Sequence, residues 1–231
     1  MKIDIIYRCC NNETPGAPLK SSRPVWFNKL NCLSSFLHSI EVNADKIGDV
    51  IFLHDGPKGI LYHSIPKHFK TIDINEQNNC KSLLKTFEIA DNLQNNLYFV
   101  EDDYLHLPHS INTIYHGTNN FQLVTGYDHL DRYTRLDDIT KGKEYIAFWK
   151  KTNCHWRTAE STCCTWSCNR ELWNSSMRSY ATKFQLNDRL LFRSLNSDCN
   201  IRLWTPILGV TTQVDQNLSP GINWEQFNNT L

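Results

Sequence analysis

The chain has 231 residues, 40% of them apolar and 12% aromatic, which is enough for one sizeable core. Lysine and arginine together number 24, as do aspartate and glutamate, so no net field would attract nucleic acid or an anionic membrane. No apolar run approaches the ~20 residues that span a bilayer, and the amino-terminal segment is too polar for a signal peptide.

The cysteines indicate a reducing compartment. Nine is an odd number, and the adjacent pairs Cys9-Cys10 and Cys163-Cys164 rarely suit a disulfide framework. We therefore expect a soluble, cytoplasmic protein with reduced thiols and no transmembrane segment. Because no stretch has the composition of a linker, residues 1–231 are predicted to form a single domain.

The first half alternates between the two kinds of element. Short apolar runs predict strands at 3–7, 49–56 and 68–74 and a further strand from Asn96, and helical spacing of apolar residues predicts helices at 24–40 and 77–93. This order predicts an α/β, Rossmann-type, mainly parallel sheet with helices on both faces. In such sheets ligands bind beyond the carboxyl ends of the strands.

The second half is less regular. Strands are predicted at 121–125, 144–149, 162–167 and 201–210, with helices at 170–180 and 187–195. A polar loop at 130–143 and a polar, irregular end at 217–231 complete the chain. We expect an irregular second half beside the regular first one.

An acidic triplet follows the apolar strand that begins at Asn96. Glu101, Asp102 and Asp103 would repel one another at the end of a buried strand, so stability alone does not explain them. A hard cation such as Mn²⁺ or Mg²⁺ takes carboxylate oxygens and often shares its shell with substrate phosphates. The triplet therefore predicts a site for a metal and a diphosphate, the alternative being a solvated acidic turn.

Three other polar residues occupy informative positions. Arg8 and Asp55 also follow predicted strands, and Asp55 could hydrogen-bond a nucleobase or ribose or simply begin an Asp-Gly turn. Asp188 stands at the start of a predicted helix, where it could cap the helix or act as a general base. A helix amino terminus would lower the pKa of that carboxyl.

The segment around Trp156 contains cysteine and histidine but lacks the paired spacings of a zinc site. Exposed Trp156 and Arg157 would suit a platform for a sugar ring or a clamp on phosphate. The alternative is a packed tryptophan beside a surface ion pair.

Taken in order, these motifs resemble glycosyltransferases of the GT-A type, in particular small virus-encoded enzymes of the kind found in chloroviruses, and the resemblance covers nearly the whole chain. Glu101-Asp102-Asp103 looks like a variant of their Asp-x-Asp motif. The stretches that carry the resemblance are Arg23-Pro24-Val25-Trp26-Phe27, residues 99–106, residues 127–133, His155-Trp156-Arg157-Thr158 with Ser161-Thr162, and residues 220–224.

The resemblance implies a metal-dependent transfer from a UDP- or GDP-sugar, held by residues 1–106 with Mn²⁺ or Mg²⁺, to a glycan or other hydroxyl acceptor held by residues 107–231, in the host cytoplasm if the protein is viral. Asp188 would be the base of an inverting enzyme. The implied donor residues are Arg8, Asp55 near the base, Glu101, Asp102 near the ribose or sugar, and Asp103 as main metal ligand, and the implied acceptor residues are Asp128, His129, Trp156 and Arg157.

One residue departs from the pattern. Gln213 stands where GT-A enzymes often supply a histidine to the metal, and an amide oxygen is a poorer ligand for Mn²⁺ than imidazole. Two alternatives follow. A sugar nucleotidyltransferase would usually carry a glycine-rich phosphate loop, whereas the first loop here has only Gly16. A degenerate, non-catalytic carbohydrate- or nucleotide-binding protein would explain Gln213.

Overall fold

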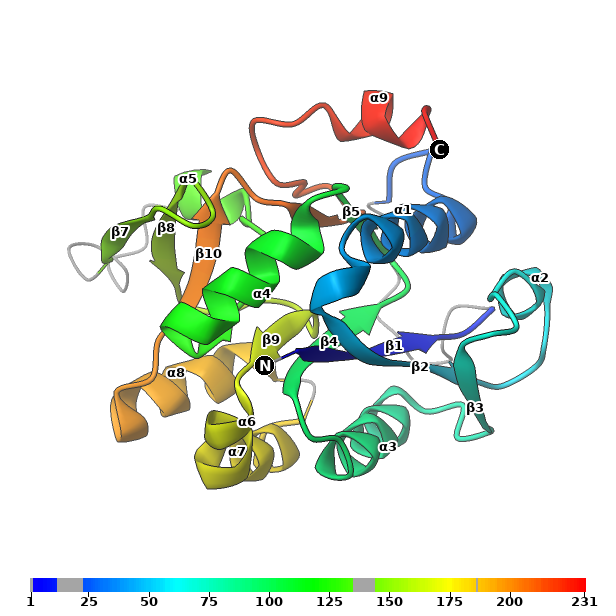
Figure 1. Cartoon of the computed structure of the whole chain (residues 1–231), viewed down its shortest axis with the longest axis horizontal. Coiled ribbons are helices and arrows are strands. Elements are labelled where there is room, and N and C mark those ends of the chain that lie inside the picture. The colour runs from blue at the N-terminus through cyan, green and yellow to red at the C-terminus, as the bar shows by residue number, and fades with distance from the viewer. Residues whose placement is uncertain (1, 12–22, 135–143, 186) are drawn as a thin grey trace.

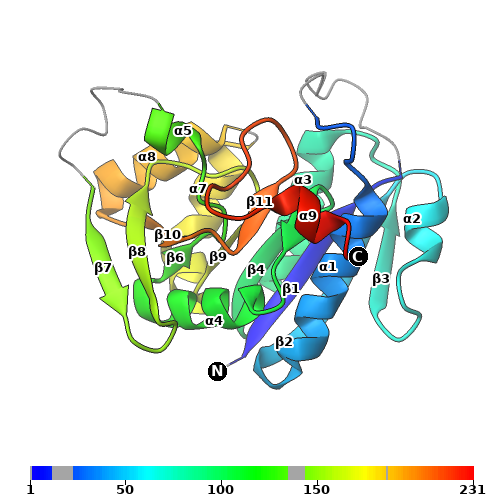
Figure 2. The same cartoon turned by 90° about the horizontal axis from the view of Figure 1, so that it is seen from above.

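A nine-stranded mixed sheet forms the centre of the protein. The computed structural model describes residues 2–11, 23–134, 144–185 and 187–231, and its sheet has the order β3-β2-β1-β4-β9-β6-β10-β8-β7 (Figure 2). The strands are β1 (Ile3–Cys9), β2 (Ile47–Asp55), β3 (Lys70–Ile74), β4 (Asn96–Glu101), β6 (Leu123–Val124), β7 (Ile146–Trp149), β8 (Cys154–Ala159), β9 (Trp166–Cys168) and β10 (Leu203–Ile207).

The first four strands are parallel to one another, as predicted. β9 runs antiparallel to both β4 and β6, β10 is parallel to β6, and β8 and β7 are antiparallel additions at the edge. Strands from both halves of the sequence therefore share one sheet. The predicted α/β class is confirmed.

Helices cover both faces of this sheet (Figure 1). One face carries α1 (Lys29–Val42) and α4 (Ser110–Phe121), and the other carries α3 (Asn79–Asp91), the run of α6 (Arg170–Leu172), η2 (Trp173–Met177) and α7 (Arg178–Lys183), and α8 (Asp188–Cys199). Short elements are η1 (Ala44–Lys46), α2 (Ile60–His63), α5 (Asp131–Thr134) and α9 (Trp224–Asn228). Among the described helices, none is both long and apolar enough to cross a membrane.

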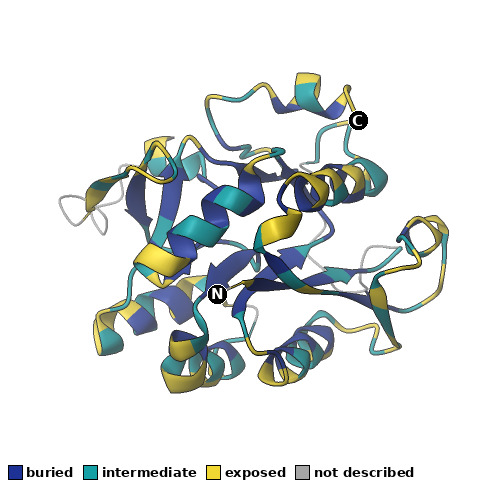
Figure 3. Cartoon of the chain, viewed as in Figure 1, coloured by how far each residue is buried: buried dark blue, intermediate teal, exposed yellow. Residues whose placement is uncertain are grey.

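The continuous apolar strands follow from burial on both faces. In β1, Ile3, Ile5 and Tyr7 enter the core under α1 and α4, while Ile6 enters the core against α3. Because successive strand side chains point to opposite faces, a strand covered on both faces is apolar at most positions. The buried exception in β1 is Asp4, whose carboxylate accepts hydrogen bonds from backbone N–H groups. Figure 3 shows the central strands buried, whereas the edge strands β3 and β7 and the outer helix surfaces are partly exposed.

A second, two-stranded sheet lies beyond the carboxyl end of β4. β5 (Tyr104–His106) pairs antiparallel with β11 (Thr211–Gln213), and Gln213 is the register partner of Tyr104. This pairing places Gln213 beside the acidic triplet. The final segment then packs α9 over α1, where Trp224 shares a small core with Cys32 and Leu105.

Several element boundaries differ from prediction. The helix expected at 24–40 begins at Lys29, because the Asn28 side chain accepts the Leu30 amide hydrogen and caps it. Helix α4 and strand β8 were not predicted, and the end expected to be irregular contains α9. Gly16 of the first loop and most of the polar loop at 130–143 lie outside the described residues.

Candidate active site

Four candidate residues lie at or near the carboxyl ends of the parallel strands of the large sheet. Arg8, Asp55 and Glu101 lie at the carboxyl ends of β1, β2 and β4, and Asp188 begins α8 next to them. The parallel register makes Arg8 the direct partner of Glu101. In α/β sheets, ligands bind beyond these carboxyl ends of the strands.

Glu101 is the ion-pair partner of Arg8. The side chains are 12% (Arg8) and 18% (Glu101) exposed, and Nη2 of Arg8 donates to Oε1 of Glu101. Arg8 Nη1 also donates to the backbone carbonyl of Asn79 at 3.3 Å. Burial lowers the pKa of Arg8, but the Glu101 carboxylate outweighs it and raises the pKa above its ordinary value. Arg8 therefore stays charged.

Asp102 joins the end of β1 to the start of α1. Its Oδ2 accepts the Cys10 amide hydrogen at 2.9 Å and a hydrogen bond from Lys29 Nζ at 2.9 Å. Lys29 Nζ also donates to the Cys10 carbonyl at 3.0 Å. Asp102 thus fixes the backbone that follows β1 next to the first turn of α1.

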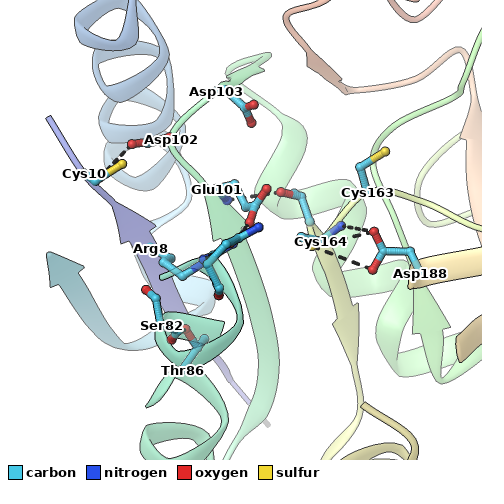
Figure 4. Close-up of polar contacts among 12 residues, drawn as sticks. Arg8, Cys10, Ser82, Thr86, Glu101, Asp102, Asp103, Cys163, Cys164 and Asp188 are labelled. Atoms are coloured by element: carbon cyan, nitrogen blue, oxygen red, sulfur yellow. Dashed lines mark hydrogen bonds and ion pairs between the residues drawn. The ribbon is translucent and has the colours of Figure 1, made fainter. Parts of the chain in front are cut away.

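Asp103 is buried against the small sheet. Its Oδ2 accepts hydrogen bonds from Arg23 Nη2 at 3.0 Å and Gln213 Nε2 at 3.1 Å, and Val214 N donates to the Asp103 carbonyl at 2.9 Å. Figure 4 shows the three carboxylates of the triplet pointing apart, Asp102 toward Cys10 and Glu101 toward Arg8. Each carboxylate of the triplet therefore forms an ion pair with a different basic residue.

Asp103 and Gln213 fit a cation only as part of a larger shell. Within the described residues, no three His, Cys, Asp or Glu side chains form a group able to hold a metal ion. Turning the Gln213 amide over would present its oxygen beside the Asp103 carboxylate, giving two oxygen donors. Mn²⁺ and Mg²⁺ take six ligands, the rest of which a diphosphate and water can supply. The pair suits a metal that arrives with its substrate.

Asp188 is held by the backbone of the segment before β9. Cys164 N donates to Asp188 Oδ2 at 3.3 Å, and the Cys164 thiol lies 3.6 Å from the same oxygen. Cys164 has a φ of +34°, a conformation that non-glycine residues rarely adopt, and this turns its N–H toward the carboxylate. The hydroxyl of Tyr104 fixes the neighbouring Cys163 carbonyl at 2.7 Å.

The environment of Asp188 makes it a stronger base than expected. Burial first, and then the nearby charge of Glu101, raise its pKa to about 6, while the Cys164 hydrogen bonds and Arg8 act in the opposite direction. The prediction that the helix amino terminus would lower this pKa is wrong. Above pH 6 the carboxylate is ionised and can accept a proton.

Asp55 serves the turn that follows its strand. It is only 8% exposed, and its Oδ1 accepts the Gln77 amide hydrogen at 3.0 Å. Gly56 has a φ of +89°, as the Asp-Gly turn requires. The turn role is therefore present, and a contact with a nucleobase stays a prediction.

Trp156 belongs to the core, so the prediction that it is exposed is wrong. It is 0% exposed, its indole N–H donates to Thr152 at 3.0 Å, and its ring packs against α4. A Cβ added to Gly117 would lie 2.3 Å from that ring, so α4 needs glycine there. Trp156 has no face available to a sugar.

Asp128 and Arg157 form a buried pair, which contradicts both the exposed clamp and the surface ion pair. Their side chains are 0% and 5% exposed, and Arg157 Nε donates to Asp128 Oδ1 at 3.1 Å. Tyr133 donates to Asp128 Oδ2 at 2.6 Å, and burial together with this bond raises the pKa of Tyr133 to about 12. His129 is partly exposed and pairs with Asp131 at 2.8 Å. Of the four predicted acceptor residues, only His129 has a side chain that is not buried.

Local patterns did not reveal three residues that complete the site. Arg23 and Lys29 neutralise Asp103 and Asp102, and Cys164 holds Asp188 through its backbone. Arg23 is part of a motif that carried the family resemblance, but neither periodicity nor spacing assigned it a partner. These contacts join segments distant in sequence.

No protein-family model and no curated protein sequence matches the chain. Solved structures do. A nucleotidyl transferase from Methanothermobacter thermautotroptrophicus has a TM-score of 0.55 at 10% identity, over 88% of this chain and 86% of that chain. A CMP:2-keto-3-deoxy-manno-octonic acid synthetase, in complex with CTP, has a TM-score of 0.50 at 11% identity, over 89% of both chains.

Glucosyl-3-phosphoglycerate synthase from Mycobacterium tuberculosis, in complex with Mn²⁺, UDP and phosphoglyceric acid, also has a TM-score of 0.50 at 11% identity. The match covers 87% of this chain but only 66% of that one. At such low identity the similarity concerns the fold, and the likeness to chlorovirus enzymes stays a prediction. The protein has the α/β fold of GT-A-type glycosyl and nucleotidyl transferases.

Proposed function

We propose that the protein is a glycosyltransferase that moves a sugar from a UDP- or GDP-sugar to a hydroxyl acceptor, such as a glycan, with inversion at the anomeric carbon. The observation that carries the proposal is the position of Asp188. A carboxylate with a pKa of about 6 begins a helix at the carboxyl edge of the sheet, beside the acidic triplet. A general base works best when its pKa lies near the working pH.

In the proposed reaction, Asp188 accepts the proton of the acceptor hydroxyl as that oxygen attacks the anomeric carbon. The bond to the nucleoside diphosphate breaks on the opposite face, so one displacement inverts the sugar. The Cys164 N–H fixes Oδ2 of Asp188, and Oδ1, which only the Cys164 thiol contacts among the described groups, at 3.7 Å, would face the acceptor. General base catalysis of this kind is typically worth about 10²–10⁴ in rate.

Asp103 and Gln213 would hold Mn²⁺ or Mg²⁺, and Arg8, Asp55, Glu101 and Asp102 would line the donor site. A bound cation would offset the charge that builds on the departing diphosphate. The Mn²⁺ and UDP in the mycobacterial synthase support a metal and a uridine nucleotide by analogy of fold. A cytoplasmic location, a donor half at 1–106 and an acceptor half at 107–231 complete the proposal.

The test is release of nucleoside diphosphate from a panel of sugar nucleotides, with and without Mn²⁺, in the presence of candidate acceptors. We expect one donor to be turned over, and Asp188→Asn to abolish turnover while leaving donor binding intact. Asp198→Asn is the matched control, because Asp198 lies at the other end of α8 and contacts Tyr180. An Asp188→Asn enzyme as active as the parent would remove Asp188 from the mechanism.

The second candidate is a nucleotidyl transferase, favoured by the TM-score of 0.55 to such an enzyme. Incubation with a nucleoside triphosphate and a sugar phosphate should then release pyrophosphate. Binding of a sugar nucleotide with no turnover under either condition would instead indicate a non-catalytic relative of the fold, for which Gln213 is the supporting feature.

A further inference from the structure

Glu101 has a place in the site that phosphate or metal binding does not explain. Its carboxylate is paired with Arg8, and its N–H donates to Thr165 Oγ1 at 3.1 Å. Figure 4 shows it between Arg8 and the contact that Cys164 makes with Asp188. Glu101 therefore lies between the arginine of β1 and the candidate base of α8.

The described groups that act on Asp188 come from three segments. Glu101 of β4 disfavours a second negative charge nearby, whereas Arg8 of β1 favours it. From the segment before β9, the Cys164 N–H and thiol donate to the carboxylate and also favour its charged form. The two charged members of this set are themselves an ion pair.

We propose that Glu101 is a positioning residue that sets the strength of Asp188 as a base, and that Arg8 limits its influence. This inference rests on the proposed function. It gives the first carboxylate of the triplet a second role, toward the base on the acceptor side of the reaction, in addition to its place in the donor site. Because Arg8 and Glu101 carry opposite charges, removing one must change Asp188 in the opposite sense to removing the other.

The experiment compares Glu101→Gln with Arg8→Met. The ionisation midpoint of the Asp188 carboxyl is measured by carbon NMR, with Asp188→Asn to assign the signal, and the pH profile of kcat is measured at saturating donor and fixed Mn²⁺. The parent midpoint is expected at about 6. Glu101→Gln should lower it by about 1 pH unit, which raises the ionised fraction at pH 5 about fivefold. Arg8→Met should raise it.

Asp102→Asn is the control, because Asp102 pairs with Lys29 and is not among the groups that act most strongly on Asp188. Its midpoint should equal that of the parent. Midpoints that stay fixed, or that move the same way in Glu101→Gln and Arg8→Met, would overturn the inference, since loss of structure alone gives no opposite signs. If Glu101→Gln does not fold, the rise in Arg8→Met decides. Opposed NMR midpoints in a protein without transferase activity would instead overturn the proposed function alone.

Discussion

Breaking the buried ion pair between Arg157 and Asp128 should destabilise the protein and leave acceptor binding unchanged. In Arg157→Met, Asp128 stays fully buried and keeps its bond from Tyr133, but it loses the guanidinium that lies 3.1 Å away at Nε. Removing one partner of a buried ion pair costs about 3–5 kcal/mol. For a chain of this size that lowers Tm by about 10 °C.

The assay is urea unfolding followed by tryptophan fluorescence. Lys85→Met is the control, because it breaks an exposed pair with Glu88 within α3, whose side chains are 43% and 55% exposed. Such pairs are worth at most about 1 kcal/mol. Adding Asp128→Asn to Arg157→Met should recover part of the loss, since the remaining buried group is then neutral.

A stable Arg157→Met protein would refute this reasoning. If its free energy of unfolding stayed within about 1 kcal/mol of the parent while KM for the acceptor rose, Arg157 would be an acceptor residue after all. The expected outcome is the reverse: lower stability, with an unchanged acceptor KM at temperatures where the variant is folded.

Gly117→Ala should cost about 1–3 kcal/mol, read as a lower urea midpoint, because its Cβ would lie 2.3 Å from the Trp156 ring. Burial and Glu101 raise the pKa of Asp188 to about 6, so the folded protein binds more protons than the unfolded chain between pH ~4 and 6. The free energy of unfolding therefore falls by up to about 3 kcal/mol as the pH rises through that window. Asp188→Asn should therefore unfold at higher urea than the parent at pH 7, and an equal or lower midpoint would contradict the burial argument. Calorimetry with Mn²⁺ alone should give no heat of binding, whereas Mn²⁺ should tighten UDP binding through Asp103 and Gln213. Equal UDP affinity with and without Mn²⁺, or an unaffected Asp103→Asn variant, would count against the metal.

The alternation of strands and helices in the first half was predictable because burial on both faces leaves a continuous apolar run. β1, β2 and β4 show that run in sequence, and their parallel register brings Arg8 and Glu101 together. The local pattern thus sufficed to place the acidic triplet at the ligand edge of the sheet.

Helix α4 escaped prediction because its sequence favours other structures. Residues 110–121 include serine, asparagine, threonine and glycine, all weak helix formers. Gly117 is present because Trp156 packs against it, and nothing near Gly117 in sequence records that contact. Strand β8 was missed for a related reason. Its residues Trp156 and Arg157 are buried by contacts with distant segments, so from sequence alone they resembled surface residues.

The Asp188 environment could not be predicted for a similar reason. The helix start was visible, but the cap is Asn187, whose side chain accepts the Leu190 amide hydrogen, and not Asp188 as considered. The pKa of Asp188 depends on burial and on Glu101. Pairing of β11 with β5, which brings Gln213 to Asp103, likewise joins segments far apart in the chain. Local sequence indicates which residues are polar, and the tertiary fold determines which charges they meet.

The charge balance of the triplet accounts for its stability and for the absence, among the residues that the structure describes, of a complete metal site beside it. Arg8 pairs with Glu101, Lys29 with Asp102 and Arg23 with Asp103, so each carboxylate has a cation from the amino-terminal part of the chain. The fold therefore needs no metal to tolerate three adjacent carboxylates. A donor diphosphate would add negative charge to this balanced set. In the proposed function a divalent cation would offset that charge when the donor binds, with Asp103 and Gln213 providing two oxygen ligands and the phosphates completing the shell.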